Sequence, residues 1–328
     1  MPGLRVLRPG LQTTVQDLGR PGHQREGVPV CGAMDTVALR LANLAVGNAA
    51  GAAALEVTLL GPTLELEEDR LLAVAGAELG AHLDGEPLRP GRPVHGRAGA
   101  RLDFSGPRRH CRAYLAFAGG IDVAPVLGSR STYLRGRFGG LEGRALAAGD
   151  AIPLGEPTPL ARRMAARIPA GESADWTIAP GEPGPYAPGA IRALAGAHLA
   201  RLTPASRAAL LEVPYRVTPE SDRMGYRLAG PALELERPLE LVSAAVAFGT
   251  VQLPAGGQPI VLMADRQTTG GYPRVLEVAT VDLPLLAQAA PGTELRFTEI
   301  SLEHAQALYI ARERRLTRVA LGIDLNHR

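Results

Sequence analysis

GPTLEL at residues 61–66 returns as GPALEL at residues 230–235, and this repeat is the best guide to the architecture. Each copy leads into an apolar run typical of a buried strand. A repeat this long predicts two duplicated domains rather than a solenoid, whose period is about 20 to 50 residues. The alternative is a chance resemblance between two β-hairpins. The later matching segments are LLAVAGA (71–77) with LVSAAVAF (241–248), Gly80 with Gly249, and GARLDF (99–104) with GTELRF (292–297).

Alternating polar and apolar residues predict short strands in both copies. TLELE at 63–67 and RAYLAF at 112–117 have the period of two that half-buried strands show. Asp84-Gly85 and Gly256-Gly257 are turn signals between such strands. The chain also holds 39 Gly and 28 Pro, above the usual combined share of roughly 12%. We therefore expect a mainly β protein built from sandwiches or barrels.

Four helices are marked by their starts. Asp35 precedes an apolar stripe that Gly47 ends, Thr203-Pro204 is a cap followed by a first-turn proline, and Asp282 precedes DLPLLAQAA. From Ser301 an amphipathic pattern predicts a C-terminal helix. The side chains expected to pack are Val37, Leu41, Leu44 and Ala45 in the first helix, and Leu302, Ala305, Leu308 and Tyr309 in the last.

The repeat and the helix signals together predict the domain boundaries. A turn-rich segment with the charged run RRMAAR separates the copies and reads as a linker. The predicted parts are an N-terminal domain (1–155), a linker (156–190), a C-terminal domain (191–300), and a helix with its tail (301–328).

Composition excludes several functions. All 35 basic residues are arginine, so the chain cannot form a lysine Schiff base, supply a P-loop lysine or carry biotin on its own side chain. The formal net charge is only +2, which is too small for a protein that binds nucleic acid or membrane surfaces non-specifically. The N-terminal residues lack the apolar stretch of a secretory signal, and a cytoplasmic location is expected. Small molecules or proteins are the expected partners.

Cysteine and histidine patterns give no metal or disulfide signal. Cys31 and Cys111 have no CxxC spacing and read as buried free thiols. The seven histidines show neither HxxxH nor HExxH spacing, so no metal site is assigned. A serine-hydrolase elbow and a dinucleotide fingerprint are also missing, because GSRST (128–132) is not GxSxG and GRFGGLEGR (136–144) is not GxGxxG.

The richest candidate site is ADRQTTGGYPR at 264–274, a polar loop between two apolar strands. Arg266 can hold a carboxylate or phosphate with two parallel hydrogen bonds, and the backbone N–H groups of a Gly-Gly pair can face an anion. This pattern predicts an oxyanion site. The alternative is a β-turn whose arginine and aspartate pair with each other. The other candidate anion ligands in this loop are Gln267, Thr268, Thr269, Gly270 and Gly271.

Similar loops occur elsewhere, where arginine stands beside carboxyl, hydroxyl or amide groups. Asp17, Asp222 and Asp265 are candidate general acids or bases, and we expect them, with Arg266, to be catalytic. A carboxylate beside an arginine usually stays ionised, which favours an orienting role. The remaining candidate substrate or anion ligands are Gln16, Arg20, Ser129, Arg130, Ser131, Ser221 and Arg223.

These same loops resemble a known family. GLQTTVQDLGRPG, GVPVCGAMD, RAYLAFAGGIDV, VLGSRSTY, SDRMGYRL and PIVLMADRQTTGGYPR look like the family of 5-oxoprolinase C subunits. That family is also described as KipA-like, as allophanate hydrolase subunit 2-like, or as biotin-dependent carboxyltransferase subdomains A and B. The resemblance runs from about residue 10 to about residue 300 and implies two cyclophilin-like β-barrel domains related by duplication.

The resemblance also implies a function. A protein of this kind joins a KipI-like B subunit, and the two work with an A subunit to open 5-oxo-L-proline to L-glutamate, with ATP and Mg²⁺ shared with the partners. Arginine-rich loops suit the charge that develops in such chemistry. We expect Arg20, Arg223 and Arg266 to face one cleft with four polar side chains. Those side chains are Asp17, Asp222, Gln267 and Thr268.

Two other functions stay open under the same resemblance. One is a carboxyltransferase subunit of the urea or allophanate type. Because the chain has no lysine, biotin would then sit on a separate carrier protein. The other is a KipA-like regulatory protein that antagonises a kinase inhibitor by binding alone.

Overall fold

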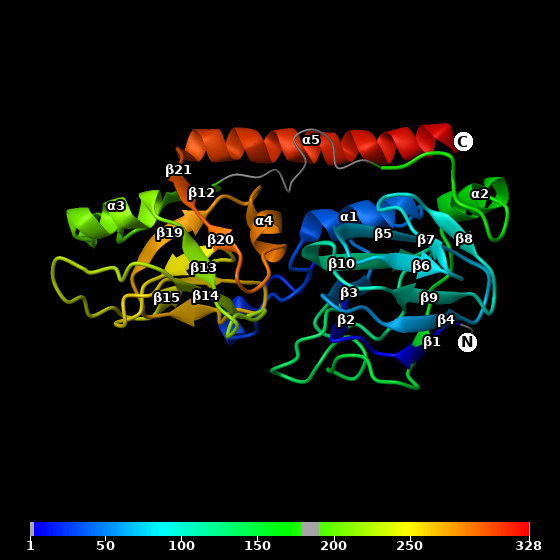
Figure 1. The fold of residues 1–328 in the computed structure, drawn as a ribbon, viewed down its shortest axis with the longest axis horizontal. Helices are drawn as coiled ribbons and strands as arrows, with labels where there is room; N and C mark the ends of the chain where they lie inside the picture. The colour runs from blue at the N-terminus through cyan, green and yellow to red at the C-terminus, as the bar shows by residue number, and fades with distance from the viewer. Residues whose placement is uncertain (1–2, 179–189, 328) are drawn as a thin grey trace. The chain divides into compact units, whose positions relative to one another are not determined.

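The computed structural model describes residues 3–178 and 190–327, and it divides into two compact units. The part of the chain that is described holds five α-helices among many short strands (Figure 1). The prediction of a mainly β protein is confirmed. The first unit consists of Met1–Arg20, Cys31–Gly184 and Arg314–Arg328, and the second of Pro21–Val30 and Pro185–Glu313.

The predicted linker is not a simple loop. Helix α2 (Pro159–Arg167) lies within it, begins with Thr158 as its N-cap, and belongs to the first unit. Thr158 Oγ1 accepts a hydrogen bond from Ala161 N at 3.0 Å, which satisfies one free N–H of the first turn. The rest of the predicted linker, 179–189, lies outside the described residues.

The first unit contains two antiparallel sheets. Their strand orders are β11-β1-β4-β9-β6-β7 and β2-β3-β10-β5-β8. The bounds are β1 Gly3–Arg8, β2 Gln12–Gln16, β3 Ala54–Thr58, β4 Thr63–Leu66, β5 Arg70–Glu78, β6 Ala81–Leu83, β7 Glu86–Pro87, β8 Val94–Gly96, β9 Arg101–Phe104, β10 Arg109–Phe117 and β11 Ala151–Pro153.

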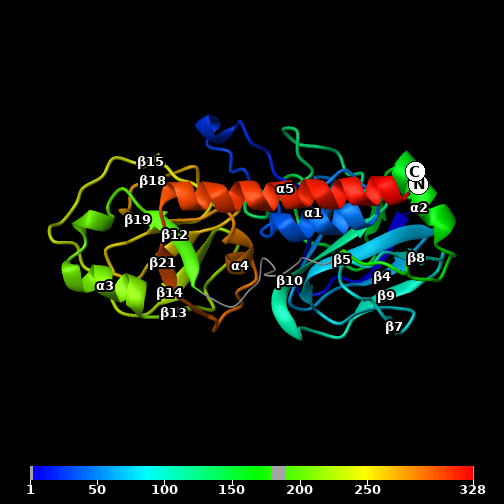
Figure 2. The same ribbon diagram turned by 90° about the horizontal axis from the view of Figure 1, so that it is seen from above.

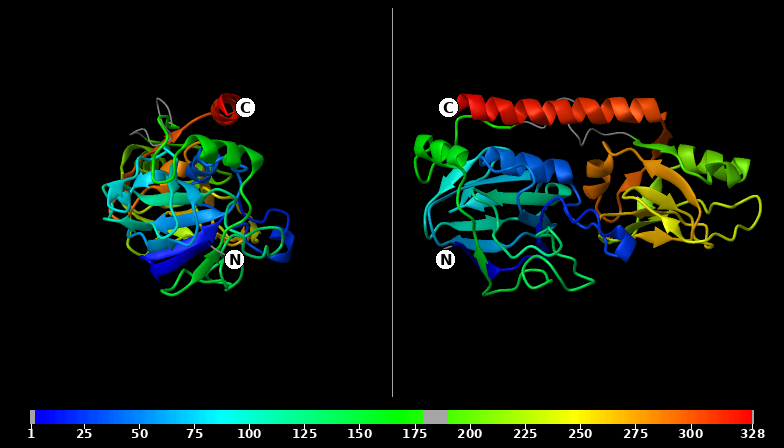
Figure 3. Two further views of the ribbon diagram at one scale, coloured as in Figure 1. Left: turned by 90° about the vertical axis from the view of Figure 1, so that its right-hand side faces the viewer. Right: turned by 180° about the vertical axis from the view of Figure 1, so that it is seen from behind.

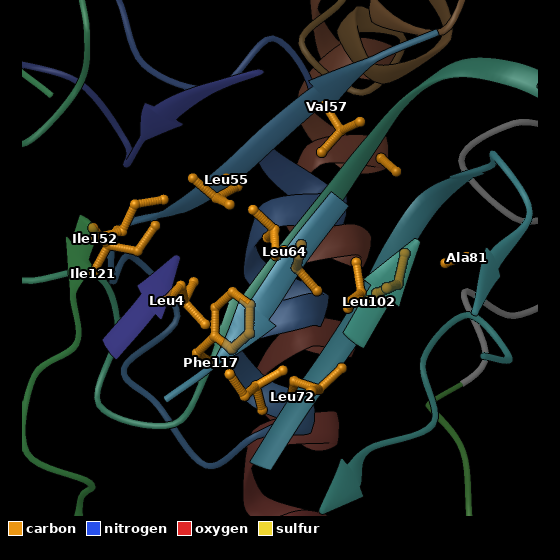
Figure 4. Close-up of a cluster of buried hydrophobic side chains, with 14 of the residues drawn as sticks. Leu4, Leu55, Val57, Leu64, Leu72, Ala81, Leu102, Phe117, Ile121 and Ile152 are labelled. Carbon is orange, nitrogen blue, oxygen red and sulfur yellow. The ribbon is translucent and has the colours of Figure 1, made fainter. Parts of the chain in front are cut away.

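The two sheets of the first unit enclose an apolar core. Leu4, Leu64 and Leu102 come from the first sheet, and Leu55 and Phe117 come from the second (Figure 4). All five side chains are fully buried. Burying one such side chain contributes roughly 1.5–3 kcal/mol, so this cluster is a main source of the unit's stability.

The outer face of the second sheet is covered by helix α1 (Thr36–Ala45). On β5, Leu72 and Val74 point into the core between the sheets, while Ala73 and Ala75 pack with α1. Small side chains on that face let the helix approach closely. The sequence thus encodes two packed faces on one strand through its period of two.

Helix α1 begins as the sequence predicts. Asp35 accepts a hydrogen bond from Ala38 N at 2.9 Å, and Gly47 follows the helix with φ +74°. Val37, Leu41 and Ala45 are buried. Figure 2 shows α1 alongside the C-terminal part of the last helix, which belongs to the same unit.

The second unit is built on one eight-stranded sheet, which curls into a nearly closed barrel (Figures 1 and 3). Its order is β20-β13-β14-β17-β16-β19-β12-β21, and the pair β12–β21 is parallel. A separate pair, β15–β18, completes the unit. The bounds are β12 Ile191–Ala195, β13 Tyr215–Val217, β14 Gly225–Ala229, β15 Ala244–Ala245, β16 Thr250–Gln252, β17 Ile260–Leu262, β18 Thr269–Gly270, β19 Arg274–Val278, β20 Glu294–Leu295 and β21 Phe297–Glu299.

The repeat does not hold strand for strand. We expected 241–248 to form an apolar strand in the place of β5, but within this run Ala244–Ala245 alone is a strand, and both residues are exposed. Val242 in the same run is 93% exposed. This prediction is wrong because, in the described ranges, β15 pairs with the two-residue strand β18 and with no larger sheet that could bury the run.

Two predicted helices of the second unit form. Helix α3 (Pro204–Glu212) is capped by Thr203, whose Oγ1 accepts from Ser206 N at 3.2 Å. Helix α4 (Leu283–Ala287) follows Asp282, but the Asp282 carboxylate accepts from Arg192 N and Arg192 Nε instead of capping the helix. The tertiary ion pair outcompetes the local cap. Short 3₁₀ turns occupy Gln24–Glu26 and Leu199–Arg201.

Helix α5 (Leu302–Asn326) begins in the second unit and ends in the first. The predicted packing face is confirmed only in part: Ala305 and Leu308 are half-buried, whereas Leu302 and Tyr309 are 54% and 44% exposed. Its buried side chains are Leu316 and Ile323, which join the core beside α1. In the described ranges, neither this helix nor any other is long and apolar enough to span a bilayer.

Candidate functional site

In the first unit, Asp17 ties the loop after β2 to the loop at 129–131. Its carboxylate accepts hydrogen bonds from Gly19 N at 2.8 Å, Ser129 Oγ at 2.6 Å, Arg130 N at 2.6 Å and Ser131 Oγ. Four donors surround a carboxylate that has no arginine in an ion pair with it among the described residues. The orienting role expected for Asp17 relied on a neighbouring arginine, and it stays a prediction. Because both serine hydroxyls donate to Asp17, their protons point toward its carboxylate.

Arg20 is fully buried in the same loop. Its Nε donates to Val126 O at 3.4 Å, its Nη2 donates to Ser131 O, and its Cζ lies 4.9 Å from the centre of the Phe138 ring. Within the described ranges, its Nη1 has no hydrogen-bond partner. A buried guanidinium held by carbonyls and a ring keeps donor capacity for an anion.

The neighbouring candidates take part in the same framework. Gln16 Nε2 donates to Thr14 Oγ1 at 3.0 Å and to Thr132 O at 3.2 Å. Its Oε1 is buried and has no donor in the described part of the chain. Arg130 donates to Val123 O and pairs with Asp122 at 2.9 Å near the surface. The structure therefore brings all six first-unit candidates into one cluster.

In the second unit, Arg223 and Asp265 form a buried ion pair. Nε and Nη2 of Arg223 lie 2.9 Å from the two carboxylate oxygens of Asp265, and the side chains are only 5% and 4% exposed. Asp265 N also donates to Arg223 O at 2.8 Å. Such a bidentate pair joins two distant loops and leaves the carboxylate little capacity for acid–base chemistry.

Asp222 and Ser221 shape the turn that carries Arg223. Asp222 Oδ1 accepts from Met224 N at 2.8 Å and Gly225 N at 3.2 Å. Ser221 Oγ accepts from Arg227 N at 3.1 Å and donates to Arg227 O at 3.3 Å. Both side chains thus stabilise the local backbone, a common use of short polar residues in turns.

The polar loop after Asp265 lies beside the β15–β18 pair. Arg266 donates weakly to Val246 O and Met263 O, both at 3.4 Å, and its Cζ lies 5.9 Å from the Phe248 ring centre. Gln267 Nε2 donates to Gln252 Oε1 at 3.4 Å. Thr268 O accepts from Val246 N, while Thr269 and Gly270 form β18. Gly271 is exposed just beyond that strand.

Three polar side chains on the neighbouring strands were missed by the sequence analysis. Thr250 and Gln252 on β16 are fully or almost fully buried, and Thr250 Oγ1 donates to Glu277 Oε2 on β19 at 2.7 Å. Burial raises the pKa of Glu277, although the Thr250 hydrogen bond and Arg274 act against it. The sequence does mark these three residues, because each is a polar residue within an otherwise apolar strand. Thr250 and Gln252 lie in GTVQLP, and Glu277 lies in RVLEVAT.

His198 lies at the edge of the same region. Its Nδ1 accepts from Arg274 N at 3.1 Å, which places the ring proton on Nε2. Burial lowers the pKa of His198, and the charges of Arg274 and Arg201 add to that effect. The imidazole is therefore neutral at pH 7.

The candidate residues thus fall into two clusters, one in each unit. Asp17 and Arg20 belong to the first, and Asp222, Arg223 and Arg266 belong to the second. A single cleft shared by all of them stays a prediction. Cys31 and Cys111 are buried free thiols, as expected. Over 3–178 and 190–327, no three His, Cys, Asp or Glu side chains are grouped so that they could hold a metal ion.

Comparison with known proteins identifies the family. The model of the carboxyltransferase domain, subdomain A and B, matches residues 26–299. This chain belongs to that family. The carboxyltransferase-domain chain is 43% identical to the 5-oxoprolinase C subunit of Escherichia coli strain K12, over 92% of its own length and 93% of the relative.

More distant relatives are larger proteins. The carboxyltransferase-domain chain is 32% identical to a urea amidolyase of Lachancea kluyveri, over 92% of its own length but only 17% of that protein. The crystal structure of the Kluyveromyces lactis urea carboxylase superimposes with a TM-score of 0.87 at 30% identity. That match covers 97% of this chain and 29% of the other.

Proposed function

We propose that the chain is the C subunit of an ATP-dependent 5-oxoprolinase, which opens 5-oxo-L-proline to L-glutamate together with its A and B subunits. The observation that carries the proposal is the near full-length relationship to a protein named as the C subunit of 5-oxoprolinase. The urea amidolyase relationship is weaker and covers a small part of a much longer protein. In this proposal the B subunit is KipI-like, and ATP with Mg²⁺ is shared with the partner subunits.

The chemistry explains why arginine and amide groups would be needed. A lactam carbonyl is a poor electrophile, because the ring nitrogen donates its lone pair to it. Transfer of a phosphoryl group from ATP to the carbonyl oxygen gives phosphate as a leaving group. One water adds to the activated carbon, the C–N bond breaks, and the ring nitrogen takes up protons and leaves as the amine, which gives an acyl phosphate. A second water then cleaves the acyl phosphate to the carboxylate of glutamate and inorganic phosphate. Negative charge grows on oxygen in these steps, where fixed donors stabilise it.

This chain supplies such donors in both units. Arg20 keeps Nη1 without a partner among the described side chains, and Arg266 has long hydrogen bonds of 3.4 Å to two carbonyls. Both are permanently charged and suit a substrate carboxylate or a phosphate. Asp17, Asp222 and Asp265 are proposed to orient these loops rather than to transfer protons.

A second candidate function is a carboxyltransferase subunit of the urea or allophanate type. The close structural match to a urea carboxylase favours it. Because the chain has no lysine, carboxybiotin would arrive on a separate carrier protein. A third, KipA-like role predicts binding to a partner without turnover.

Reconstitution separates these functions. The purified chain is mixed with the A and B subunits, ATP, Mg²⁺ and 5-oxo-L-proline, and ADP and glutamate are followed over time. We expect stoichiometric ADP and glutamate that require all three proteins. No turnover under conditions that support a known 5-oxoprolinase rejects the proposal. Carboxylation of urea by a biotin carrier, or tight binding to the KipI-like partner without turnover, would then support the second or third function.

A further inference from the structure

Gln252 is a buried amide with an unused donor. Its side chain is 2% exposed, and its Oε1 accepts from Gln267 Nε2 at 3.4 Å. Its Nε2 has no hydrogen-bond partner in the part of the chain that the structure describes. A buried amide donor without an acceptor costs free energy, so natural proteins rarely keep one without a use.

The backbone of Gly270 lies close to this donor. A Cβ added to Gly270 would lie 2.5 Å from Gln252 Nε2, so only glycine fits there without displacing the amide. Gly270 belongs to β18, which pairs only with the two exposed residues of β15. A ladder of two residues without buried side chains opens at low free energy. Opening it would expose the Nε2 group of Gln252.

The same face of the sheet offers an acceptor. Thr250 and Gln252 are two residues apart on β16 and therefore point to one side. Glu277 stands opposite Thr250 in the register and accepts its hydroxyl. Arg274 stands opposite Gln252, and its Nη1 donates to Ala245 O on the covering strand. A donor, a carboxylate and a cation thus lie on neighbouring positions of β16 and β19, and Arg274 also contacts β15.

We propose that Gln252 recognises the amide carbonyl of the substrate, with Nε2 donating to that oxygen once the β15–β18 pair moves aside. In this arrangement the Glu277 carboxylate would face the ring N–H of the substrate, and Arg274 would face the carboxylate of the substrate. This inference rests on the proposed function for the identity of the ligand, 5-oxo-L-proline. Gln252 acts as a specificity residue in it, because L-proline has the same ring and carboxylate but no ring carbonyl.

The test compares Gln252→Met with wild type in the complex with the A and B subunits. Methionine keeps the length of the side chain and removes the donor. Calorimetric titration should show about tenfold weaker binding of 5-oxo-L-proline, which corresponds to about 1.4 kcal/mol. Binding of L-proline should not change. The steady-state KM for 5-oxo-L-proline should rise in parallel with a smaller change in kcat, as for lost ground-state binding. Gln306→Met, at an exposed position on α5, is the matched control.

The melting temperature of Gln252→Met and a second variant show whether a loss of binding comes from the missing donor or from misfolding. Methionine also removes the Oε1 acceptor of the long hydrogen bond from Gln267. Without ligand, Gln252→Met should nevertheless melt no lower than wild type, because it also removes a buried donor that has no acceptor among the described residues. If it fails to fold, Gln252→Glu replaces the same amide nitrogen with an oxygen and should weaken binding similarly. If wild type and variants bind 5-oxo-L-proline with equal affinity, the role of Gln252 is overturned, while the proposed function of the chain stands.

A different outcome separates the two proposals. If the wild-type complex does not bind 5-oxo-L-proline while a known 5-oxoprolinase does, the proposed function fails. Urea, which also carries an amide carbonyl, then becomes the probe. Weaker urea binding by Gln252→Met supports the role of Gln252, and equal or absent binding in both chains overturns it.

Discussion

Arg223 and Asp265 have the sequence pattern of catalytic residues, but in the structure they form a buried ion pair that joins two loops. Both loops carry polar residues after apolar strands, the usual appearance of a site. The two side chains are nevertheless buried and satisfy each other through two hydrogen bonds of 2.9 Å. The β-turn alternative, in which Asp265 pairs with Arg266 of its own loop, is not what the structure shows, because the Asp265 carboxylate is held by Arg223 from a distant loop.

Removing one partner of this pair should be costly. Asp265→Asn leaves the buried Arg223 charge without its counter-charge, and we expect the free energy of unfolding to fall by about 3–5 kcal/mol. Urea denaturation measures it. Glu294→Gln is the control, because Glu294 lies 3.8 Å from Arg216 with both side chains at least 60% exposed. That change should cost less than about 1 kcal/mol. Equal midpoints for both variants would contradict the structural role.

Glu277 should make stability depend on pH. Burial raises its pKa in the folded chain above the ordinary value of 4.5, so the folded state binds the proton more tightly than the unfolded chain. Its stabilising contribution is complete below pH 4.5 and is lost as the pH rises through the raised pKa. Glu277→Gln should therefore gain stability relative to wild type as the pH rises from about 4 to about 7. Urea midpoints that differ by a constant amount across this range would contradict the expectation.

At the scale of elements, the loop that holds Arg20 depends on glycine at one position. Gly139 has φ +71°, and a Cβ there would lie 2.1 Å from Ser131 O and 2.8 Å from Arg20 Nη2. The loop can therefore approach the guanidinium only without a side chain at residue 139. This contact is not visible in the sequence, where 39 glycines offer equal candidates.

Gly139→Ala should destabilise the first unit by more than the backbone strain alone. Gly149 also has a positive φ, +90°, but a Cβ there meets nothing within 4 Å. Gly149→Ala therefore reports the strain, about 1 kcal/mol, and the excess loss in Gly139→Ala reports the clash. Thermal unfolding of both variants gives the difference. A smaller loss for Gly139→Ala than for Gly149→Ala would refute the close approach.

Elements with strong local signals were predictable, and those that depend on a distant partner were not. Asp35 and Thr203 cap α1 and α3 because a cap needs only the next three residues. Asp282 looks equally suited, yet its carboxylate binds Arg192, which is 90 residues away in sequence. The apolar run at 241–248 is mostly exposed for a similar reason, since among the described strands it pairs with two-residue β18 and with no long strand.

At the scale of the whole molecule, helix α5 carries the chain from the second unit into the core of the first. Leu316 and Ile323 are 5% and 8% exposed within the cluster that includes α1. Leu325 on the same helix is 62% exposed. Val319 packs against the same cluster, and Arg163 lies 3.6 Å from Asp324, so the C-terminal part of the helix is held to the first unit by apolar side chains and by an ion pair.

Truncation of one of those side chains tests this attachment. Leu316→Ala should lower the free energy of unfolding of the first unit by about 2–5 kcal/mol, because it leaves a cavity in a packed core. Leu325→Ala should change it by less than about 0.5 kcal/mol. Urea denaturation followed by the fluorescence of Trp176 reports on the first unit, since Trp176 packs against that cluster. Equal effects of the two changes would show that α5 is not anchored there.

The sequence by itself determined the mainly β class, the starts of four helices, the buried thiols and the family. These depend on residue periodicity, on neighbours within one turn, or on motifs shared with relatives. Tertiary structure alone decided that the Asp17 carboxylate accepts from four donors and that Arg223 and Asp265 pair with each other. It also decided that, among the described residues, the buried Nε2 of Gln252 has no acceptor. Arg223 and Asp265 are 42 residues apart, and Asp17 and Ser131 are 114 apart. Only folding sets which of these groups meet away from water.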